Sequence, residues 1–351
     1  MTRRLTIATL VVGQPMGQQV YEEEVAARAP AALGPGITVH RTVARSLRSP
    51  LAGTVRLPHW VLREAPSGAR RAVGAVMYPG ADVVHRMGLS LPPARVPEIV
   101  TVHDTVAWRF PDESAPEPFA AQETRRAAAV VSVSQFAADD VAERLGLDHV
   151  HVVHNGVDGR FFDAPPLSSA QLEGLGVTGP YVLHAGGSSI RKNLDGLAAA
   201  WPLVRSSYPG ISLVLSGPPS ERRNTLFGAL AGTVLVGRVP AAMVPGLIAG
   251  ARAVVVPSLY EGFGLPALEA MACRVPVVAA DRSSLPEVCG DAGILVEPDG
   301  PALADGLVHA LRRDGDVEER VARGRARAAG FTWEASAAGH AAIWREVLDR
   351  I

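Results

Sequence analysis

The loop His184–Gly196, "HAGGSSIRKNLDG", combines glycines with two adjacent cations. Lys192 is the only lysine among 34 basic residues, and the other 33 are arginine. An ammonium group is a compact point charge on a flexible stem, so it suits a phosphate that needs no planar fork. Gly186 and Gly187 would let the backbone come close to such a ligand. The same stretch also fits a surface turn with two solvated cations, Arg191 and Lys192.

A second stretch, residues 257–281, follows the same plan. It begins after a buried apolar run, passes through the glycine turn "EGFGLP", and enters a helical pattern in which Pro266 stands near the first position. The backbone amides of Phe263, Gly264 and Leu265 are expected to point outward beside the start of this helix. Amides at a helix N-terminus form an anion site.

Two glutamates flank this loop. Glu261 lies on the loop, and Glu269 is expected near the first helical turn. Compensation of the helix dipole, worth about 0.3–1 kcal/mol, would explain Glu269 on its own. Because the proline interrupts the segment, the two carboxylates do not stack on one helix, and they can contact different parts of one ligand.

The elements that carry these loops are short apolar runs alternating with helical patterns. Each run is continuous rather than alternating, which is typical of parallel strands covered on both faces. Two series of such runs predict an α/β protein of two doubly wound domains, and open sheets of this type bind ligands at the carboxyl ends of their strands. The runs are residues 5–12, 81–85, 98–104, 128–134 and 149–156, then 181–187, 212–217, 233–237, 251–258 and 275–281.

The domain boundary is expected in residues 155–180, which are rich in Gly, Pro and Ser. We therefore predict one domain over residues 1–160 and a second over 161–334, with a terminal helix over about 335–351 that packs back on the first. The N-terminal sequence resembles a signal peptide, but no A-x-A-type cleavage site follows, so it is interpreted as a buried strand of a cytoplasmic protein.

Composition narrows the classes of partner. The chain has 351 residues and a net charge of −1, so no general basic field gathers nucleic acid. It has no apolar run near the ~20 residues of a membrane span. Residues 41–71 hold seven arginines and one acid, Glu64, and form either a solvated loop or an acceptor-facing or anionic surface. No metal ion is expected, because the loops at residues 184–196 and 257–269 hold no D-x-D motif and no His/Cys cluster.

The stretch Ser258–Gly300 strongly resembles the donor-site signature of retaining glycosyltransferases of the GT-B fold, in particular family 4. Its E-x7-E spacing is met by Glu261 and Glu269. The segment "GGSSIRKNL" resembles the donor-phosphate loop of this family, and "VLVGRVPAAMVPGLIAGARAVVVPS" resembles the part that holds the nucleobase. In the first half, "GQQVYEEEV", "VHDTVAWRFP", "VSVSQFAADDV" and "VVHNGVDGRFF" are similar to family segments. The resemblance covers most of the chain and is weakest over residues 30–80.

This resemblance implies a GT-B protein whose two Rossmann-like domains face a central cleft. It implies that Lys192, with Arg191 beside it, contacts the donor diphosphate, that Glu269 binds ribose hydroxyls, and that Glu261 approaches the donor sugar. His103 would lie near the reacting sugar carbon and joins Glu261, Lys192 and Arg191 in the catalytic set. The remaining donor-binding residues would be Gly17, Gly186, Gly187, Ser188, Gly237, Arg238, Val239, Phe263, Gly264 and Leu265.

Some features limit these assignments. Many relatives have arginine or threonine early in the phosphate loop, where this chain has Gly187 and Ser188, so Arg191 and Lys192 would have to supply most of the charge. His103 follows a strand, and without the resemblance it would be interpreted as a structural histidine. His85 and His184, also at strand ends, are structural residues or supports of the site. Asp104 either orients His103 or caps the next segment.

The implied function is transfer of a hexose or deoxyhexose from a GDP- or UDP-type nucleoside-diphosphate sugar to a hydroxyl acceptor, with retention and without a metal or other cofactor. The acceptor would be a small molecule or lipid-linked, with at most peripheral membrane contact. A sugar-nucleotide epimerase and a non-catalytic sugar-nucleotide-binding protein remain alternatives. A nicotinamide oxidoreductase would need G-x-G-x-x-G after the first strand, where this chain has "GQPMG".

Overall fold

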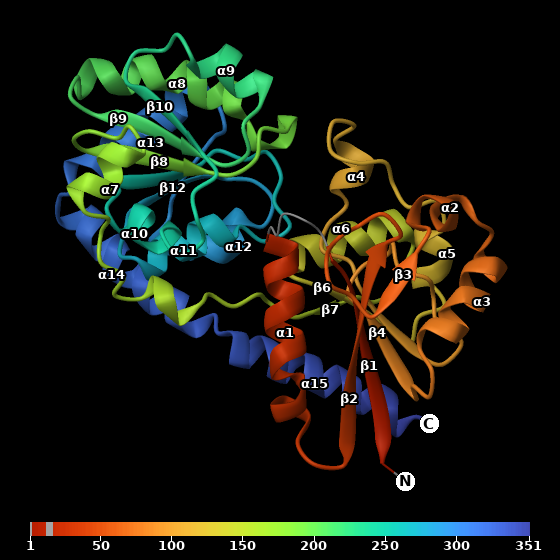
Figure 1. Cartoon of the computed structure of the whole chain (residues 1–351). Coiled ribbons are helices and arrows are strands. Elements are labelled where there is room, and N and C mark those ends of the chain that lie inside the picture. Colours follow the sequence, from red (N-terminus) through yellow and green to blue (C-terminus); the bar gives the residue numbers. More distant parts are fainter. Residues whose placement is uncertain (1, 12–16) are drawn as a thin grey trace. The chain divides into compact units, whose positions relative to one another are not determined.

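The computed structural model describes residues 2–11 and 17–351, and the chain divides into two compact units (Figure 1). The first unit comprises residues up to Gly156 together with Trp333–Ile351, and the second comprises Val157–Thr332. The chain therefore passes from one unit to the other between residues 156 and 157 and returns between 332 and 333. Residues 12–16, which include most of "GQPMG", lie outside the described residues.

The first unit is built on a parallel sheet that, over the described residues, has seven strands in the order β3-β2-β1-β4-β5-β6-β7. Every residue of β4, β5 and β6 is buried, because helices cover both faces of the sheet. The strands are β1 (Arg3–Leu10), β2 (Ile37–Ser46), β3 (Val55–Leu57), β4 (Val83–Arg86), β5 (Glu98–Thr101), β6 (Ala129–Ser132) and β7 (His151–Val152).

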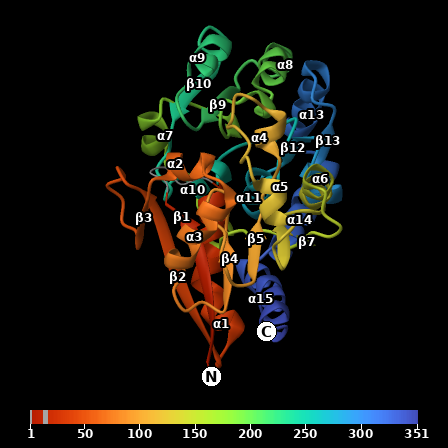
Figure 2. The same ribbon diagram turned by 90° about the vertical axis from the view of Figure 1, so that its right-hand side faces the viewer.

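The helices of this unit connect successive strands, and the last one comes from the far end of the chain (Figure 2). α6 shows why such a helix begins and ends where it does: the Ser134 side chain accepts from the Ala137 amide, and Gly146 ends the helix at a φ of 63°. The helices are α1 (Gly17–Leu33), α2 (His59–Glu64), α3 (Ser67–Met77), α4 (Val106–Arg109), α5 (Ala120–Thr124), α6 (Gln135–Leu145) and α15 (Trp333–Asp349).

The arginine-rich segment 41–71 is not a solvated loop, so that interpretation of the sequence was wrong. It contains the end of β2, all of β3 and α2, and the start of α3. Arg41 pairs with Glu23 on α1, and Arg70 is fully buried against Glu123. The sequence did not reveal this, because only the packing of the unit decides which arginine turns inward.

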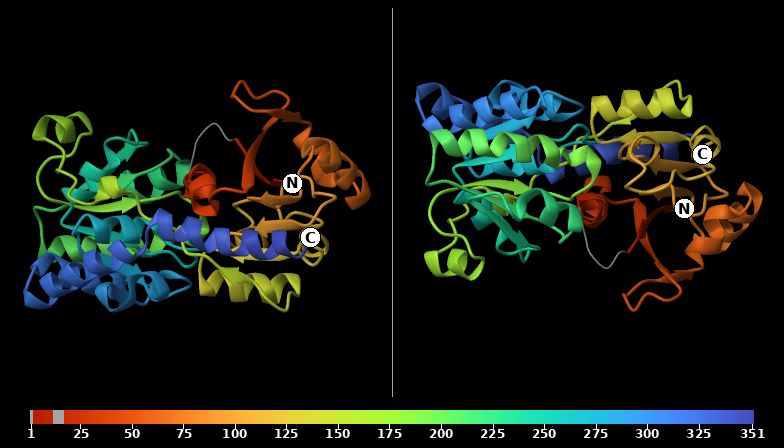
Figure 3. Two further views of the ribbon diagram at one scale, coloured as in Figure 1. Left: turned by 90° about the horizontal axis from the view of Figure 1, so that it is seen from below. Right: turned by 90° about the horizontal axis from the view of Figure 1, so that it is seen from above.

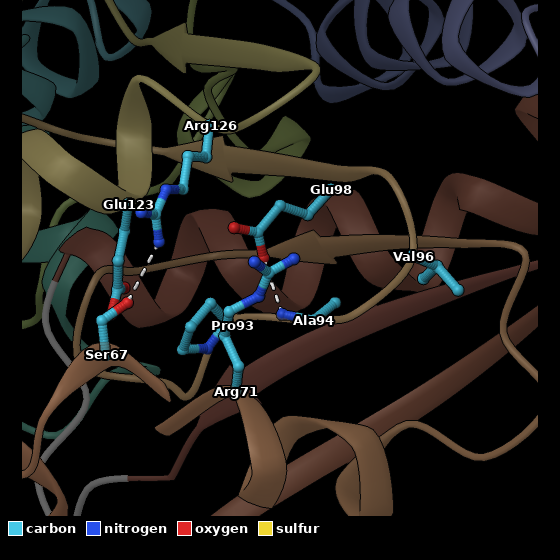
Figure 4. Close-up of a pocket in the computed structure, with 8 residues that line it drawn as sticks. All are labelled: Ser67, Arg71, Pro93, Ala94, Val96, Glu98, Glu123 and Arg126. Carbon is cyan, nitrogen blue, oxygen red and sulfur yellow. Dashed lines mark hydrogen bonds between the residues drawn. The ribbon is translucent and has the colours of Figure 1, made fainter. Parts of the chain in front are cut away.

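Arg70 belongs to a buried ion-pair network. Its Nε lies 2.8 Å from Glu123 Oε1, and Arg86 contacts Glu123 Oε2 at 2.9 Å and Glu98 Oε2 at 3.0 Å. Figure 4 shows Glu98 and Glu123 beside a pocket of about 30 Å³. This volume holds about two water molecules, so the pocket is too small for a substrate. The network joins α3, α5, β4 and β5, and breaking such a buried pair costs about 3–5 kcal/mol.

α15 lies beside α1 and joins the first unit through a chain of hydrogen bonds (Figure 3). Trp344 Nε1 donates to His85 Nδ1 at 2.9 Å, so the proton of neutral His85 is on Nε2, from which it reaches the Thr101 hydroxyl at 2.9 Å. His340 Nδ1 donates to Ser336 O at 2.8 Å. Its Nε2 therefore accepts from the Tyr21 hydroxyl at 2.7 Å.

The proton order of this chain is thereby determined, since Thr101 then donates to the Tyr21 oxygen at 3.0 Å. All five side chains are buried. Burial lowers the pKa of His340 to about 4, and burial together with the charges of His340 and His103 also lowers the pKa of His85 well below its usual value. Both histidines are neutral at pH 7, as the hydrogen-bond order requires. The two ends of the chain also meet here, where Arg3 Nη1 contacts Asp349 Oδ1 at 2.7 Å.

The second unit repeats the plan. Six parallel strands follow the order β10-β9-β8-β11-β12-β13 across residues that the structure describes. Trp201, Leu213 and Val255 lie in its main hydrophobic core. The strands are β8 (Tyr181–Ala185), β9 (Ser212–Ser216), β10 (Thr233–Gly237), β11 (Ala253–Val256), β12 (Val277–Ala280) and β13 (Ile294–Val296).

Helices again follow the strands, and α8 packs beside α13 (Figure 1). The segment after Gly156 enters this unit as a short 3-10 turn, η1 (Gly159–Phe161), whose Phe161 is buried. Among the described residues, no helix is both long and apolar enough to cross a bilayer. The other elements are α7 (Ser169–Gly174), η2 (Ile190–Lys192), α8 (Leu194–Ser207), α9 (Glu221–Phe227), α10 (Val244–Ala249), α11 (Leu265–Ala272), α12 (Leu285–Cys289), η3 (Gly290–Ala292), α13 (Gly300–Arg312) and α14 (Gly315–Gly330).

Both sheets have the order of a doubly wound fold, with the third, second and first strands on one side and the fourth onward on the other. The direction of winding reverses between β1 and β4 in the first unit and between β8 and β11 in the second. Ligands of open α/β sheets bind outside the carboxyl ends of the strands at such a reversal. In the second unit, this is the position of the loops after β8 and β11.

Candidate functional site

The loops after β8 and β11 lie side by side because these two strands are hydrogen-bonded neighbours. The first loop runs through the glycine turn and η2 into α8, and the second runs from Pro257 to α11. Asn193 joins them: its Nδ2 donates to Pro257 O at 3.0 Å, and its Oδ1 caps α8 by accepting from Gly196 N at 3.3 Å. The Leu259 amide also donates to Arg191 O at 2.7 Å.

Lys192, Arg191 and Glu261 form one cluster across the two loops. Lys192 Nζ lies 2.6 Å from Glu261 Oε1, and Arg191 Nη1 lies 3.0 Å from Oε2. The Ser258 hydroxyl donates to Oε1 at 2.7 Å. Lys192 and Glu261 are both buried. The only lysine of the chain is therefore not a solvated cation on a surface turn.

The electrostatics of this cluster favour a fixed carboxylate and an excess of positive charge. Burial by itself raises the pKa of Glu261, but the charges of Lys192 and Arg191, with hydrogen bonds from Lys192 and Ser258, outweigh burial and lower it to about 2. Two cations against one carboxylate leave a net charge of +1. An anion can bind on the side of the cluster where Lys192 and Arg191 lie. Glu261 holds both of these cations in place.

The glycine turn after β8 is shaped by Gly217, which directly follows the neighbouring strand β9. Gly217 has a φ of +136°, and a Cβ there would lie 2.0 Å from Gly186 O. Gly186 and Gly187 themselves do not have positive φ. A Cβ on Gly187 would meet no atom within 4 Å, so this turn offers open space to a ligand rather than an unusual backbone angle. Ser188, next along the turn, is half-buried.

Arg223 is a residue of this site that the sequence analysis missed. It comes from the first turn of α9, is fully buried, and donates through Nη2 to the carbonyl oxygens of Gly186, Gly187 (3.3 Å) and Ser216 (3.2 Å). Its Nε is buried without a partner among the described residues, and burial lowers its pKa. Arg223 thus fixes the backbone of the glycine turn and brings a third cation beneath it.

Replacing Arg223 with lysine is expected to weaken binding of a nucleoside diphosphate about tenfold. Arg223 contacts Pro218 O through Nη1 and the other three carbonyl oxygens through Nη2, and a single ammonium cannot take both positions. Titration calorimetry measures this change. Arg222→Lys is the matched control, since Arg222 pairs with Asp195 at the surface. Unchanged affinity in Arg223→Lys, with only a lower melting temperature, would show that Arg223 stabilises the fold without positioning the turn.

The start of α11 supplies backbone donors. Gly264, with a φ of 107°, precedes the helix, and Pro266 has no N–H to offer. Within the described chain, the amides of Gly264 and Leu265 have no hydrogen-bond acceptor. The Phe263 side chain points into the protein, where its ring meets Phe331 with 5.8 Å between centroids. The loop is fixed from below, because Ser284 Oγ donates to Phe263 O at 2.8 Å.

Glu269 is the fifth residue of α11 and so begins the second turn, one step later than the sequence indicated. It is half-buried, and its carboxylate has no hydrogen bond or ion pair with any described residue. Burial raises its pKa to about 7, with a smaller lowering by Arg160 and a smaller increase from Asp158. A carboxylate without a partner at the edge of a site is available to ligand hydroxyl groups.

Gly237 ends β10, the edge strand that β9 separates from β8, and Arg238 and Val239 follow it. Gly237 has a φ of 66°, and its carbonyl oxygen accepts from the Gly217 amide at 2.8 Å. Arg238 is exposed and Val239 is half-buried. Like the glycine turn, these residues lie at the carboxyl ends of the strands. They are farther from the point between β8 and β11 where the winding reverses.

The remaining predicted residues belong to the first unit. His103 follows β5, and its Nε2 is buried without a partner within the described chain. Its ring meets Tyr21 edge-on, with 4.7 Å between centroids. Burial and the charge of His340 lower its pKa to about 4, although a hydrogen bond with the Met87 backbone opposes them. His103 is therefore neutral at pH 7.

Four other positions named from the sequence lie among the described residues. Gly17 is the exposed first residue of α1. Asp104 Oδ1 accepts from the Val106 amide at 3.1 Å and so caps α4. His184, at the end of β8, is buried beneath the glycine turn, and its Nδ1 donates to Val255 O at 3.2 Å. His85 belongs to the hydrogen-bond chain that holds α15.

Comparison with protein families matches both halves of the chain. Residues 18–160 match the model described as Glycosyltransferase Family 4, and residues 179–313 match Glycosyl transferases group 1. The chain belongs to glycosyltransferase family 4. This family assignment agrees with the resemblance of the Ser258–Gly300 segment and with the two parallel sheets of the GT-B fold.

The chain is also similar to individual curated proteins in sequence and to solved structures in fold. The chain is 41% identical over 181 residues to O-antigen chain mannosyltransferase B of Escherichia coli, which covers 48% of this chain and 46% of that protein. It spans about half the length of the curated relatives it matches. Sucrose-phosphate synthase of Thermosynechococcus elongatus shares the fold, with a TM-score of 0.77 and 21% identity. The match covers 99% of this chain and 100% of the synthase. Anabaena HepE, solved in complex with UDP-glucose, has the same fold with a TM-score of 0.69 and 18% identity. The match covers 99% of this chain and 100% of HepE.

Among the described residues of this family 4 chain, no group of three or more His, Cys, Asp or Glu side chains is placed to hold a metal ion. The positive charge of the second unit's site comes instead from Lys192, Arg191 and Arg223. Together with the Gly264 and Leu265 amides, these groups can bind a polyphosphate, and Glu269 can bind hydroxyl groups.

Proposed function

We propose that this protein is a glycosyltransferase that moves a hexose or deoxyhexose from a UDP- or GDP-type sugar nucleotide to a hydroxyl group. The observation that carries the proposal is the net positive cluster of Lys192, Arg191 and Glu261 at the reversal of the second sheet. The HepE structure in complex with UDP-glucose supports a sugar nucleotide as the donor.

The donor phosphates would bind to the cationic side of this cluster. When the sugar leaves, negative charge builds on the diphosphate and the sugar becomes oxocarbenium-like. Lys192 and Arg191 are already fixed by Glu261, so they stabilise that charge without reorganising. The Gly264 and Leu265 amides add the dipole of the α11 N-terminus.

Glu269 would bind the ribose hydroxyls of the donor. Its carboxylate has no protein partner, and its pKa of about 7 leaves it able to accept or donate a hydrogen bond near neutral pH. Glu261 would contact the donor sugar through the one hydrogen-bond acceptor site that the described residues leave open on its carboxylate. Its two oxygens carry three hydrogen bonds from Lys192, Arg191 and Ser258, and a carboxylate has about four acceptor sites.

His103 would meet the donor sugar through Nε2, which is buried and without a partner in the described chain. Because the ring is neutral at pH 7, it would act by accepting or donating a hydrogen bond and not as a cation. The tautomer follows the backbone: if Nδ1 donates to Met87, Nε2 accepts from a sugar hydroxyl.

We further propose that the reaction retains the anomeric configuration and needs no divalent metal. Retention is supported by the donor-site signature of the Ser258–Gly300 segment. Metal independence is supported by the charge of the site, since Lys192 and Arg191 can neutralise the diphosphate. The acceptor is proposed to be a carbohydrate or polyol hydroxyl, because O-antigen chain mannosyltransferase B is among the relatives.

The experiment is incubation with UDP- and GDP-sugars and a panel of glycoside acceptors, with and without EDTA. The proposal expects sugar transfer at the same rate with and without EDTA. It also expects the product, read by NMR, to have the same anomeric configuration, axial or equatorial, as the donor sugar. Conversion of the sugar nucleotide to an isomer without transfer would indicate an epimerase. Binding without turnover of any donor would indicate a non-catalytic sugar-nucleotide-binding protein.

A further inference from the structure

The first unit contains a second pocket that no step above uses. Its volume is about 470 Å³, which lies within the range of about 300–1,000 Å³ that is usual for small-molecule sites. The pocket beside the buried ion pairs is far smaller, about 30 Å³ (Figure 4). The larger pocket is lined by Arg63, Glu64, Leu89, Ala107, Trp108, Ser114, Ala115 and Glu117.

The place of this pocket in the fold is that of a ligand site. Arg63 and Glu64 are on α2, which follows β3, and Leu89 follows β4. Ala107 and Trp108 are on α4, which follows β5. The pocket is thus built on segments that leave the carboxyl ends of three parallel strands, where α/β sheets bind their ligands.

The floor of the pocket is apolar and includes an aromatic ring. Trp108 and Leu89 pack against the core cluster that contains Val100 and Val102, but both remain partly exposed. Both residues line the pocket. A sugar ring has one face of C–H groups, which packs on an indole, and the indole N–H can at the same time meet a hydroxyl group.

The wall of the pocket is polar and partly fixed. Arg63 Nη2 donates to the carbonyl oxygens of Ala115 at 2.8 Å and Pro116 at 3.0 Å, and its Nε lies 3.8 Å from Glu117 Oε2. The second terminal nitrogen of Arg63 has no partner among the described residues, nor do the side chains of Glu64 and Ser114. Donors and acceptors that are held in position before binding reduce the entropy lost on binding.

The charge of the wall selects against anions. Arg63 contributes one positive charge, and Glu64 and Glu117 contribute two negative charges, so the pocket is net −1. Burying a phosphate or carboxylate here would place it beside like charges. An uncharged, hydroxyl-rich ring can use both the donors and the acceptors.

We propose that this pocket binds a neutral sugar residue of the acceptor, with Trp108 beneath the ring and Arg63 and Glu64 bonded to its hydroxyl groups. The inference rests on the proposed function, because it names the class of acceptor for a sugar transfer. It also adds a charge rule: the sugar in this pocket carries no phosphate or carboxylate.

The test uses the full chain and saturation-transfer NMR with methyl glycosides of mannose, glucose, galactose, N-acetylglucosamine and rhamnose, and with mannose 6-phosphate and glucose 6-phosphate. Each is titrated with and without a saturating nucleoside diphosphate. Trp108→Ala removes the stacking face. Ala115→Trp fills the mouth of the pocket without removing core contacts, because Ala115 is exposed. Val61→Ala, a change at an exposed α2 residue that does not line the pocket, is the control.

The proposal expects at least one neutral glycoside to bind, and to bind about tenfold more weakly in both Trp108→Ala and Ala115→Trp but not in Val61→Ala. No binding by any neutral glycoside, binding in both pocket variants as strong as in the wild type, or preference for the sugar phosphates would overturn it. Binding of the nucleoside diphosphate is measured in the same samples. If the wild type does not bind the nucleoside diphosphate, the proposed function fails. If it binds the nucleoside diphosphate but no neutral glycoside, only the acceptor pocket fails.

Discussion

Replacing Lys192 with methionine is expected to weaken binding of nucleoside diphosphates about 100-fold, or about 2.7 kcal/mol, and to leave binding of the free nucleoside unchanged. The substitution keeps an unbranched apolar stem, one atom shorter than lysine, and removes the ammonium. Glu261 then neutralises Arg191 alone, and the net charge of the cluster falls from +1 to zero. Because Lys192 is buried, solvent does not screen the lost charge.

Titration calorimetry with UDP, GDP, uridine and guanosine measures this difference. Arg222→Met is the matched control, since it removes a cation that pairs with Asp195 at the surface of the same unit. The melting temperature without ligand shows whether the variant is folded, and Arg191 and Ser258 still bond Glu261 to support the loop. Equal weakening of diphosphate and nucleoside would contradict the assignment of Lys192 to the phosphates.

Lowering the pH from 6 to 5 is expected to destabilise the first unit by about 3 kcal/mol. The pKa values of His103 and His340 are lowered to about 4, and that of His85 falls well below 6.5, so these histidines stay neutral while the unfolded chain takes up protons. Each contributes about 1.4 kcal/mol per pH unit. Glu22 acts in the opposite sense, because burial raises its pKa to about 7. Three histidines less one glutamate leave a net difference of two protons.

The sign follows from the lowered pKa values: the stability is present above about pH 6.5 and is lost as the pH falls toward 4. Urea unfolding at pH 7, 6 and 5 measures the slope. His103→Gln removes one titrating ring and is expected to reduce the slope by about 1.4 kcal/mol per pH unit. His40→Gln, at an exposed position of β2, is expected to leave it unchanged. A pH-independent stability, or an unchanged slope in His103→Gln, would show that these rings do not remain neutral.

The architecture could be predicted where strands are buried on both faces. The continuous apolar runs that become β8, β9, β11 and β12 could be recognised because burial on both faces leaves no polar alternation. β2 was not predicted: its pattern mixes buried and exposed residues, and it includes His40 and Arg41. β13 is only three residues long, too short for any period to show.

The candidate site was predictable in part. The rule that ligands bind at the carboxyl ends of parallel strands selected the loops of Lys192 and Glu261, which are 69 residues apart in the chain. That these loops are neighbours depends on β8 pairing with β11, which is a property of the sheet order. The ion pair between Lys192 and Glu261 could not be seen in the sequence, since the same residues could equally have faced a ligand separately.

Arg223 shows what local sequence cannot supply. In "SERRNTL", Arg222 and Arg223 are equivalent by pattern, but Ser220 caps α9 and thereby sets which of the two faces the sheet. Arg222 turns outward to Asp195, and Arg223 turns inward to Gly186 and Gly187. The sequence suggested that a cation is missing early in the glycine turn, and the structure brings one there from another helix.

The central claim is that one site in the second unit holds a nucleoside diphosphate between cations, helix amides and a free carboxylate. A crystal structure of the chain with UDP or GDP tests it most directly. We expect diphosphate oxygens within hydrogen-bond distance of Lys192 Nζ and the Gly264 and Leu265 amides, with the ribose hydroxyls on Glu269. A nucleotide bound elsewhere, with Lys192 still bonded to Glu261 and no ligand at α11, would contradict the account.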